Sequence, residues 1–566
     1  MKVIVIGGVA GGASAAARIR RLDEKAEIIV FERGEHVSYS NCCLPYYLSG
    51  TVARSESLVL MTPSKFKKQH NIDVRINSEV TAINRAEKTI TVKNTATREE
   101  YKETYDKLVL SPGALPIRPG SIQGIDKRHV FTVRNVTDIS RLKNYIDENS
   151  VENIAVIGGG FIGVEVAENL CNAGKNVSLV EGTNQIMAPF DFDMVQTLHK
   201  EMMDHGIDMH LSSTLTSIED HTITVSKENE AVKIKADAVV MAIGVAPETK
   251  LAADAGIEIG ETRGILVNHN YQTNDPDIYA VGDAIESFNR LMHTKGRLAL
   301  AGPAQRQARA AADHMYGIQD DNKGFIGSSC VRIFEQNAAC TGLNEKSAKK
   351  ADIPFDSVIV YPFDKVSLMP GKEYMGFKLV FEVPTGRILG AQAIGKGNVD
   401  KRIDVIAAMI TMGATLEDLK ELELCYSPVF GTAKDVVNIA ALVGLNILNG
   451  VYKQLPLTEV RRLVETNAYI VDVREEVEYK AGHIINAHNI PLTQLRERLD
   501  EIPHDVPVYV HCRTSQRSYY ATRCLQQNGF TNITNISGSY LAISLYEYFN
   551  DKMEHRTPIL TAYNFK

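Results

Sequence analysis

The chain has 566 residues, of which 44% are hydrophobic and 23% are charged, values typical of a globular protein and not of a disordered, collagen-like or coiled-coil chain. A formal net charge of −7, with Lys+Arg 62 against Asp+Glu 69, gives no indication of nucleic-acid binding. Eight cysteines are too few for a disulfide scaffold, and no apolar run reaches the roughly 18 residues of a membrane span. We therefore expect a cytoplasmic protein of about four domains without a membrane segment, in which any important cysteine is a reactive thiol.

The start of the chain has the pattern strand, glycine turn, helix, strand. The β-branched run 3–6 leads into Gly7 and Gly12, although Val9 stands where a middle glycine is usual. The second strand ends at Glu32, 20 residues after Gly12. Glycines permit the tight turn and the close approach of a pyrophosphate, and the N–H groups at the helix start hold it. The pattern predicts a dinucleotide site.

A second copy of this pattern begins about 150 residues later. Gly158, Gly160 and Gly163 complete a G-x-G-x-x-G turn between a strand at 154–157 and a helix. Glu181 ends the next strand, 18 residues after Gly163, where a carboxylate can accept a hydrogen bond from a ribose 2′-hydroxyl. The sequence thus predicts two dinucleotide sites, and we expect no metal site.

Three further segments indicate which dinucleotide each of the two turns binds. The run 275–283, which ends in Tyr-Ala-Val-Gly-Asp283, resembles the second FAD fingerprint of flavoproteins with two dinucleotide-binding domains. Segments 111–114 and 242–247 resemble the crossovers that link the FAD and NAD domains in that family. The resemblance implies FAD at the first turn, with Asp283 on its ribityl chain, and a nicotinamide nucleotide at the second. NADH is favoured over NADPH because Glu181 repels a 2′-phosphate.

The segment 38–47 carries the candidate redox cysteine. The chain has no C-x4-C pair after its first glycine turn, but Ser-Tyr-Ser-Asn-Cys-Cys-Leu-Pro-Tyr-Tyr resembles the single-cysteine segment of coenzyme A disulfide reductases and their persulfide-reductase relatives. The resemblance implies that Cys42 is the redox thiol and passes through a mixed disulfide with CoA. Cys43 stands where the family has Gly or Ala, and is either a passenger or an interceptor of a persulfide.

The same resemblance assigns a coenzyme A site. Arg18 and Arg21 match helix positions that face the CoA nucleotide, and Ser38 and Asn41 match positions beside the pantetheine. For the two arginines the alternative is a solvated helix face.

The last hundred residues resemble a rhodanese domain. Segments 470–475 and 478–484 match its D-V-R and E-Y-x-x-G-H-I motifs, and Cys512 follows a buried strand and precedes a helix. A thiol in that place sits in a cup of N–H donors, with Arg513 and Arg517 adding positive charge. We expect Cys512 to carry sulfane sulfur; the alternative is an inactive rhodanese fold.

The predicted fold is α/β: a two-dinucleotide-binding-domain flavoprotein with an α/β dimerisation domain, followed by a rhodanese-like α/β domain. The expected ranges are 1–115 and 240–322 for FAD binding, 116–239 for NAD binding, 323–448 for dimerisation and 457–566 for the rhodanese domain.

The resemblance also implies a homodimer. In the family, two tyrosines of the dimerisation domain reach across to the partner's redox cysteine, and by position these resemble Tyr361 and Tyr426.

The function expected from these motifs is NAD(P)H-dependent reduction of CoA persulfide or polysulfide to sulfide, with the rhodanese domain delivering or transferring sulfane sulfur. CoA disulfide reduction, which regenerates the CoA thiol, is the first alternative. NADH oxidase or peroxidase is the second, although that branch has a His in the first glycine turn where this chain has Ala10. A redox or sulfur sensor that binds FAD and CoA is a non-enzymatic alternative.

Overall fold

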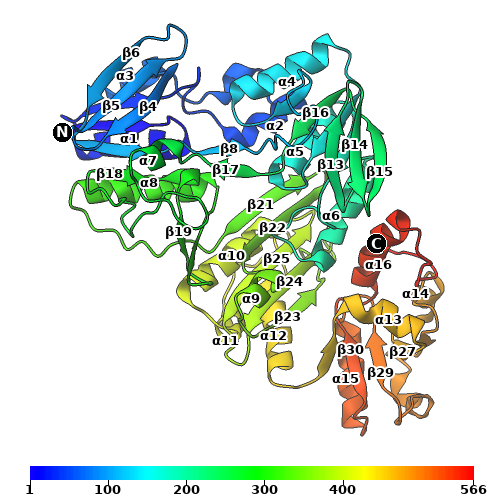
Figure 1. Cartoon of the computed structure of the whole chain (residues 1–566). Helices are drawn as coiled ribbons and strands as arrows, with labels where there is room; N and C mark the ends of the chain where they lie inside the picture. Colours follow the sequence, from blue (N-terminus) through cyan, green and yellow to red (C-terminus); the bar gives the residue numbers. More distant parts are fainter. Residues whose placement is uncertain (566) are drawn as a thin grey trace. The chain divides into compact units, whose positions relative to one another are not determined.

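The computed structural model describes residues 1–565, which form two compact units (Figure 1). The first unit contains Met1–Asn184 and Gly206–Phe325. The second contains Gln185–His205 and the chain from Ile326 onward. In the described part of the chain, no helix is both long and apolar enough to cross a membrane.

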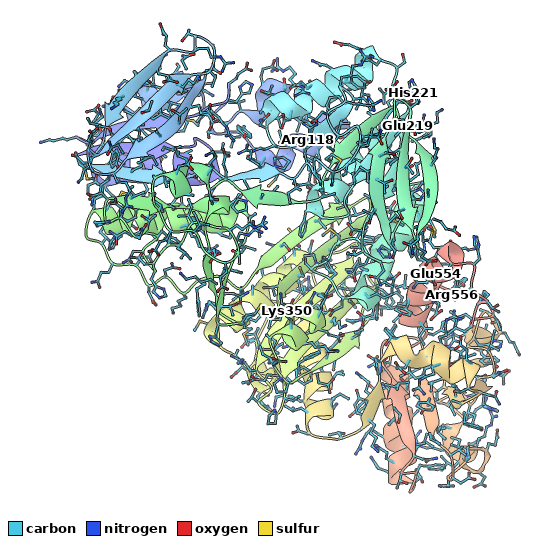
Figure 2. The ribbon with its side chains drawn as sticks, in the orientation of Figure 1. Arg118, Glu219, His221, Lys350, Glu554 and Arg556 are labelled. Carbon is cyan, nitrogen blue, oxygen red and sulfur yellow. The ribbon has the colours of Figure 1, made fainter. Side chains whose placement is uncertain are left out.

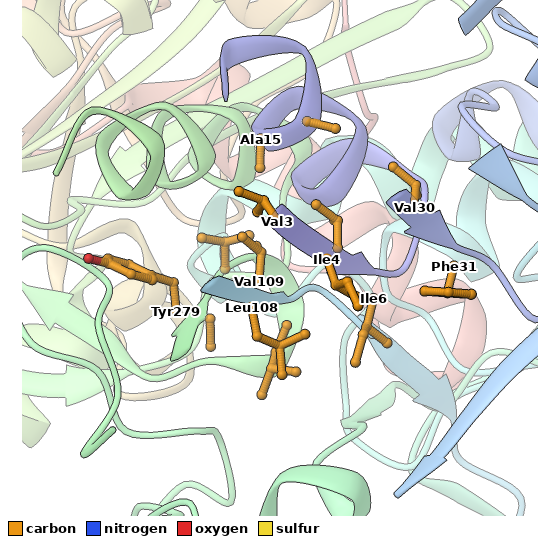
Figure 3. Close-up of a cluster of buried hydrophobic side chains, with 14 of the residues drawn as sticks. Val3, Ile4, Ile6, Ala15, Val30, Phe31, Leu108, Val109 and Tyr279 are labelled. Atoms are coloured by element: carbon orange, nitrogen blue, oxygen red, sulfur yellow. The ribbon is translucent and has the colours of Figure 1, made fainter. Parts of the chain in front are cut away.

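The first sheet of unit 1 is parallel throughout and carries the first glycine turn. Its strands, in spatial order, are β18 (Ile278–Ala280), β7 (Lys107–Leu110), β1 (Lys2–Ile6), β2 (Glu27–Phe31) and β3 (Asp73–Arg75). Nearly every side chain of β1 is buried, as expected for a parallel strand covered on both faces. Figure 3 shows this core, in which Val3, Ile4 and Ile6 pack among residues of the neighbouring strands. Helices α1 (Ala10–Leu22) and α8 (Ala301–Met315) pack against each other.

A second parallel sheet of unit 1 carries the second glycine turn. Its order is β12 (Asp208–His210), β11 (Asn176–Val180), β10 (Asn153–Ile157), β16 (Ala238–Met241) and β9 (Val130–Thr132). Helices α4 (Val136–Glu148) and α5 (Phe161–Asn172) pack on its strands. The segments expected to be crossovers run into β8 (Ala114–Pro116) and β17 (Val245–Pro247), which pair antiparallel with each other.

Smaller elements complete unit 1. The two antiparallel meanders consist of β4 (Ser78–Asn84), β5 (Thr89–Asn94) and β6 (Glu100–Thr104), and of β13 (Ser213–Ile218), β14 (Thr222–Lys227) and β15 (Glu230–Lys235). Figure 2 labels Glu219 and His221 at the β13–β14 turn. The remaining elements are α2 (Leu44–Leu48), α3 (Pro63–His70), α7 (Lys250–Asp254), β19 (Ser287–Asn289) and β20 (Thr294–Gly296), with short 3₁₀ turns η1 (Asn41–Cys43), η2 (Ser55–Leu58) and η3 (Gly282–Ala284).

Unit 2 begins with an antiparallel sheet. Its order is β21 (Ser328–Ile333), β22 (Gln336–Gly342), β25 (Ile388–Gly395), β24 (Met375–Glu382) and β23 (Phe355–Val360). Its helices are α6 (Phe192–Asp204), α9 (Glu345–Lys350), α10 (Val399–Met412), α11 (Leu416–Glu421) and α12 (Val436–Leu448). Helix α10 packs on β22 and β25, and α12 packs on β23 and β24.

Helix α6 lies within the range 116–239, which the sequence predicts to be the NAD-binding domain. The structure places α6 in unit 2, where the buried ammonium of Lys378 on β24 lies 2.8 Å from Asp193 and 3.1 Å from Asp191. Its Phe192 ring also meets Tyr546 edge to face at 5.9 Å. Buried, fully paired charge of this kind is costly to separate, so it fixes α6 on this unit.

The C-terminal part of unit 2 is a five-stranded parallel sheet. Its order is β26 (Lys453–Leu455), β30 (Ile533–Ile536), β29 (Val508–His511), β27 (Tyr469–Asp472) and β28 (His488–Asn489). Its helices are α13 (Val460–Glu465), α14 (Glu476–Lys480), α15 (Gln516–Gln527) and α16 (Ser539–Met553), with 3₁₀ turns η4 (Leu457–Glu459), η5 (Leu495–Glu497) and η6 (Leu499–Glu501). Glu554 and Arg556, labelled in Figure 2, follow α16, and Arg556 pairs with Asp551 of that helix.

Candidate functional site

Two glycines of the first turn, Gly7 and Gly12, stand where a side chain does not fit. Gly7 has φ +95°, and a Cβ placed there would lie 2.1 Å from the carbonyl oxygen of Ser111. A Cβ on Gly12 would lie 1.8 Å from the carbonyl oxygen of Gly7. Glu32 fixes the turn from the end of β2, because its Oε2 accepts from the Gly8 N–H at 2.9 Å. No side chain caps α1, so the helix start suits the pyrophosphate of a dinucleotide.

The second glycine turn repeats this construction. Gly158 has φ +113°, and a Cβ on Gly163 would lie 1.8 Å from the Gly158 carbonyl oxygen. By contrast, nothing lies within 4 Å of a Cβ placed on Gly160, which leaves open space in front of α5. Glu181 accepts from the Gly159 N–H at 2.7 Å and from the Thr183 N–H at 2.8 Å, so its carboxylate is held beside the turn. The residues at both turns therefore fit dinucleotides.

Cys42 lies in η1, exposed, just before the short helix α2. The surrounding protein raises the pKa of its thiol, first by partial burial and then through the negative charges of Glu165, Cys43 and Asp283. The candidate redox cysteine, the aspartate that resembles the second FAD fingerprint and a residue of α5 are therefore close enough to interact within unit 1. Burial also raises the pKa of Asp283, which the charge of Arg134 partly opposes.

Sequence reasoning missed Glu165, although it lies two residues after the last glycine of the second turn. Burial and the nearby charge of Glu168 raise the pKa of Glu165 to about 7. Its carboxylate is thus half-ionised near neutral pH and disfavours the Cys42 thiolate more as the pH rises. The available signal was the presence of a charged residue in the otherwise apolar start of this helix.

Replacement of Glu165 should make Cys42 more reactive near neutral pH. In Glu165→Gln the negative charge is gone, so the pKa of Cys42 falls and its thiolate fraction at pH 7.5 rises. We expect alkylation of Cys42 by iodoacetamide to be about two- to five-fold faster at that pH, and its pH profile to move to lower pH. Glu152→Gln, a surface carboxylate paired with Lys175, is the matched control. An unmoved profile in Glu165→Gln would show that the charge does not act on Cys42.

The four residues that are predicted to bind CoA differ in exposure and in hydrogen-bond partners. Asn41 is exposed and adjoins Cys42, and the Ser38 N–H donates to the Gly8 carbonyl at 2.8 Å, which ties this segment to the first glycine turn. Arg21 is exposed near the end of α1, whereas the Arg18 Nε donates to Asp313 of α8 at 2.6 Å. Arg18 is thus partly engaged within its own unit, and Arg21 is the more accessible cation.

Cys512 sits where a strand meets a helix in the second unit. It follows β29, is 1% exposed, and its backbone N–H donates to the Ser539 hydroxyl at 3.2 Å. Ser515, at φ +72°, closes the loop before α15. The expected loop is therefore present, with the start of α16 supplying one wall.

The two loop arginines do different things. The Arg517 guanidinium donates two hydrogen bonds to Glu478, at 2.6 and 2.7 Å, and these bonds, together with the carboxylate charge, raise the pKa of Arg517. Arg513 is 8% exposed and donates to the Asn564 carbonyl at 3.1 Å, and burial lowers its pKa. Arg474 is fully buried, and its Nη2 lies 2.6 Å from Oδ2 of Asp472. The D-V-R motif is therefore a buried ion pair that stabilises this domain.

Comparison with known proteins identifies this arrangement. The sequence model described as Pyridine nucleotide-disulphide oxidoreductase matches residues 1–308, its dimerisation domain matches 329–435 and a rhodanese-like domain matches 456–545. The chain belongs to the pyridine nucleotide-disulphide oxidoreductase family. The predicted family and fold class are confirmed.

The similar proteins include coenzyme A disulfide reductases and a persulfide reductase. The coenzyme A disulfide reductase of Staphylococcus haemolyticus is 33% identical over 439 residues, which cover 77% of this chain and 98% of the relative. The solved structure of reduced Bacillus anthracis CoADR-RHD is 43% identical with a TM-score of 0.93, over 96% of this chain and 98% of that one. An NAD-dependent persulfide reductase from A. fulgidus is 33% identical with a TM-score of 0.90, over 96% and 100%.

The two tyrosines that are expected to reach the redox cysteine of the other subunit in a homodimer differ in exposure. Tyr426 is 51% exposed, beside the exposed Val429 and Phe430. Tyr361 is only 6% exposed, with its ring against Gly376, and burial raises the pKa of its phenol. Tyr426 is therefore the more accessible of the two phenols in the single chain, and the role of both tyrosines at a partner's cysteine stays a prediction.

Proposed function

We propose that this protein is an NADH-dependent flavoprotein that reduces CoA persulfide or polysulfide to sulfide through Cys42, while its rhodanese domain supplies sulfane sulfur through Cys512. The observation that carries the proposal is the presence, in one chain, of a single-cysteine reductase site and an intact rhodanese loop. A persulfide reductase with a similar fold over nearly the whole chain supports the choice of substrate. Eight cysteines in 566 residues are too few for a disulfide scaffold, which favours a cytoplasmic, reducing compartment.

The thiol chemistry follows from having one redox cysteine. The Cys42 thiolate attacks the CoA-bound sulfur of CoA–S–SH, the S–S bond breaks, and HS⁻ leaves with the bonding pair. The product is Cys42–S–S–CoA, whose two-electron reduction returns the Cys42 thiolate and releases CoA thiolate. FAD bound at the first turn would supply the path by which an electron pair from NADH reaches this disulfide. Asn41 and Ser38 would position the pantetheine, and Arg21 and Arg18 the nucleotide.

CoA disulfide reduction is the second candidate, favoured by the staphylococcal relatives. It uses the same mixed disulfide, but the group that leaves is CoA thiolate rather than sulfide. A water-forming NADH oxidase from Lactobacillus brevis shares the fold at 27% identity and a TM-score of 0.75 over 80% of this chain and 99% of that one. Ala10 in the first turn, in place of a His, argues against peroxide chemistry.

The test compares acceptors under one set of conditions. NADH oxidation is measured anaerobically with CoA persulfide, polysulfide and CoA disulfide, and separately with oxygen or peroxide. The proposal requires the highest kcat/KM with a persulfide or polysulfide. A higher value with CoA disulfide would move the function to the second candidate, and a higher value with oxygen or peroxide to the oxidase branch.

We also propose a homodimer in which Tyr426 faces the partner's redox site. Its support is the match to a dimerisation domain and the exposed apolar surface of Tyr426, Val429 and Phe430. A phenol hydroxyl there would donate to a leaving thiolate and stabilise its charge.

Glu181 should make NADH the preferred nucleotide. Its carboxylate, held beside the turn by the Gly159 and Thr183 N–H groups, accepts from a 2′-hydroxyl but repels a 2′-phosphate. We expect kcat/KM for NADH to exceed that for NADPH by at least about ten-fold, and Glu181→Ala to narrow the ratio. Glu152→Ala, at the surface before β10, should leave it unchanged. Equal efficiency of the wild type with both nucleotides would refute this role.

A further inference from the structure

The segment that carries Cys42 is attached at both of its ends. At its start, the Ser38 N–H donates to a carbonyl oxygen of the first glycine turn at 2.8 Å. At its end, Ser49 directly follows α2, and its hydroxyl donates to the side-chain oxygen of Asn169 on α5 at 2.7 Å. Helix α5 begins at the second glycine turn. Residues 38–49 therefore connect the first turn with the helix of the second, and Cys42 lies between the two attachments.

Asn169 is a buried hydrogen-bond partner for this segment. Its side chain is 2% exposed. The side-chain nitrogen donates to the Glu165 carbonyl oxygen, one turn earlier in α5, at 2.8 Å, and the side-chain oxygen accepts from Ser49. Both ends of the buried amide are thus hydrogen-bonded. A buried polar group that loses its partner costs more free energy than the bond itself contributes, so the contact between Ser49 and Asn169 resists separation.

The short helix between Cys42 and Ser49 links this attachment to the thiol. Helix α2 follows η1, which contains Cys42, without a break, and its Leu44 and Leu48 are 1% and 2% exposed. It packs against α4 and α5. A helix of five residues has little stability of its own, so its place depends on the groups that it contacts. The position of the exposed Cys42 therefore depends on how α2 is held.

We propose that Asn169 is a positioning residue of the reductase: through Ser49 it holds the Cys42 segment on the helix of the nicotinamide-nucleotide site. The proposal deepens the proposed function and rests on Cys42 as the redox thiol. That thiol takes part in two steps, capture of the substrate sulfur and reduction of the mixed disulfide. Both steps need the sulfur in a defined place, and a small displacement lowers the rate.

The experiment measures anaerobic NADH oxidation by full-length Ser49→Ala with CoA persulfide and with CoA disulfide. Loss of the hydroxyl should lower kcat about three- to ten-fold. KM for NADH should stay within about two-fold of wild type, because the second glycine turn is unchanged. Amide hydrogen exchange of residues 41–49 in the holoenzyme, measured by mass spectrometry, should be at least about three-fold faster. In an Asn169→Leu background, Ser49→Ala should have no further effect.

Thr51→Val is the matched control. The exposed Thr51 hydroxyl lies 3.0 Å from the Ser49 hydroxyl, so this variant removes a local partner of Ser49 and leaves the bond to Asn169 in place. It should match the wild type in kcat and in hydrogen exchange. Ser49→Thr, which retains a hydroxyl, should keep most of the activity that Ser49→Ala loses.

The contrary results are distinct. An active enzyme whose kcat is unchanged in Ser49→Ala overturns the inference alone. The same holds for a fall in kcat without faster exchange, for an equal loss in Thr51→Val, and for an equal effect of Ser49→Ala with and without Asn169. A wild type whose reductase activity does not depend on Cys42 overturns the inference together with the role of Cys42.

Discussion

Cys42→Ser is expected to lose reduction of both CoA persulfide and CoA disulfide by at least about a thousand-fold, while the protein stays yellow with bound FAD. Serine is a far weaker nucleophile than a thiolate and forms no mixed disulfide, so the step that captures the substrate sulfur is lost. FAD should stay bound because the residues expected to hold it, Gly7, Gly12 and Glu32, form the first glycine turn without any contribution from Cys42. The measurements are the flavin absorbance spectrum and anaerobic NADH oxidation with each acceptor.

Cys43→Ser is the matched control for this prediction. Cys43 lies directly after Cys42 in the same 3₁₀ turn, η1, and its side chain is less exposed than that of Cys42. We expect this variant to keep most of the reductase activity. Full activity of Cys42→Ser together with loss in Cys43→Ser would move the redox role to Cys43.

Cys512→Ser is expected to abolish thiosulfate sulfurtransferase activity, with a loss of at least about a thousand-fold, because only the thiolate accepts sulfane sulfur. NADH-dependent reduction of free CoA disulfide should stay within about two-fold of wild type, since that reaction needs FAD and Cys42. The control is Cys524→Ser, a thiol on α15 outside the loop. A large loss of CoA disulfide turnover in Cys512→Ser would instead place the rhodanese thiol inside the reductase cycle.

What the sequence predicts well are features that a local backbone requires. Only glycine fits at positions 12 and 163, because a Cβ there would lie 1.8 Å from the carbonyl oxygen of Gly7 or Gly158. This requirement makes the glycine spacing recognisable in the sequence. The same holds for Cys512, whose position between a strand and a helix is a local property.

Features set by packing between distant segments were not predictable. Asp313, which engages Arg18, lies 295 residues further along the chain, and Tyr361 is enclosed by Gly376 and the turn at Gly538. Lys378 holds α6 in the second unit through its ion pairs with Asp191 and Asp193. The local sequence around these residues does not indicate their partners. The chain contains many polar and aromatic residues with equivalent local patterns, so the pairing becomes visible only in the folded structure.

The most direct test of the account is the stoichiometry of sulfide release. CoA persulfide is reduced anaerobically with limiting NADH, and sulfide and free CoA thiol are measured. The account predicts one sulfide and one CoA thiol for each NADH oxidised, with the whole signal dependent on Cys42. NADH consumption without sulfide, or equal sulfide release by Cys42→Ser, would contradict it.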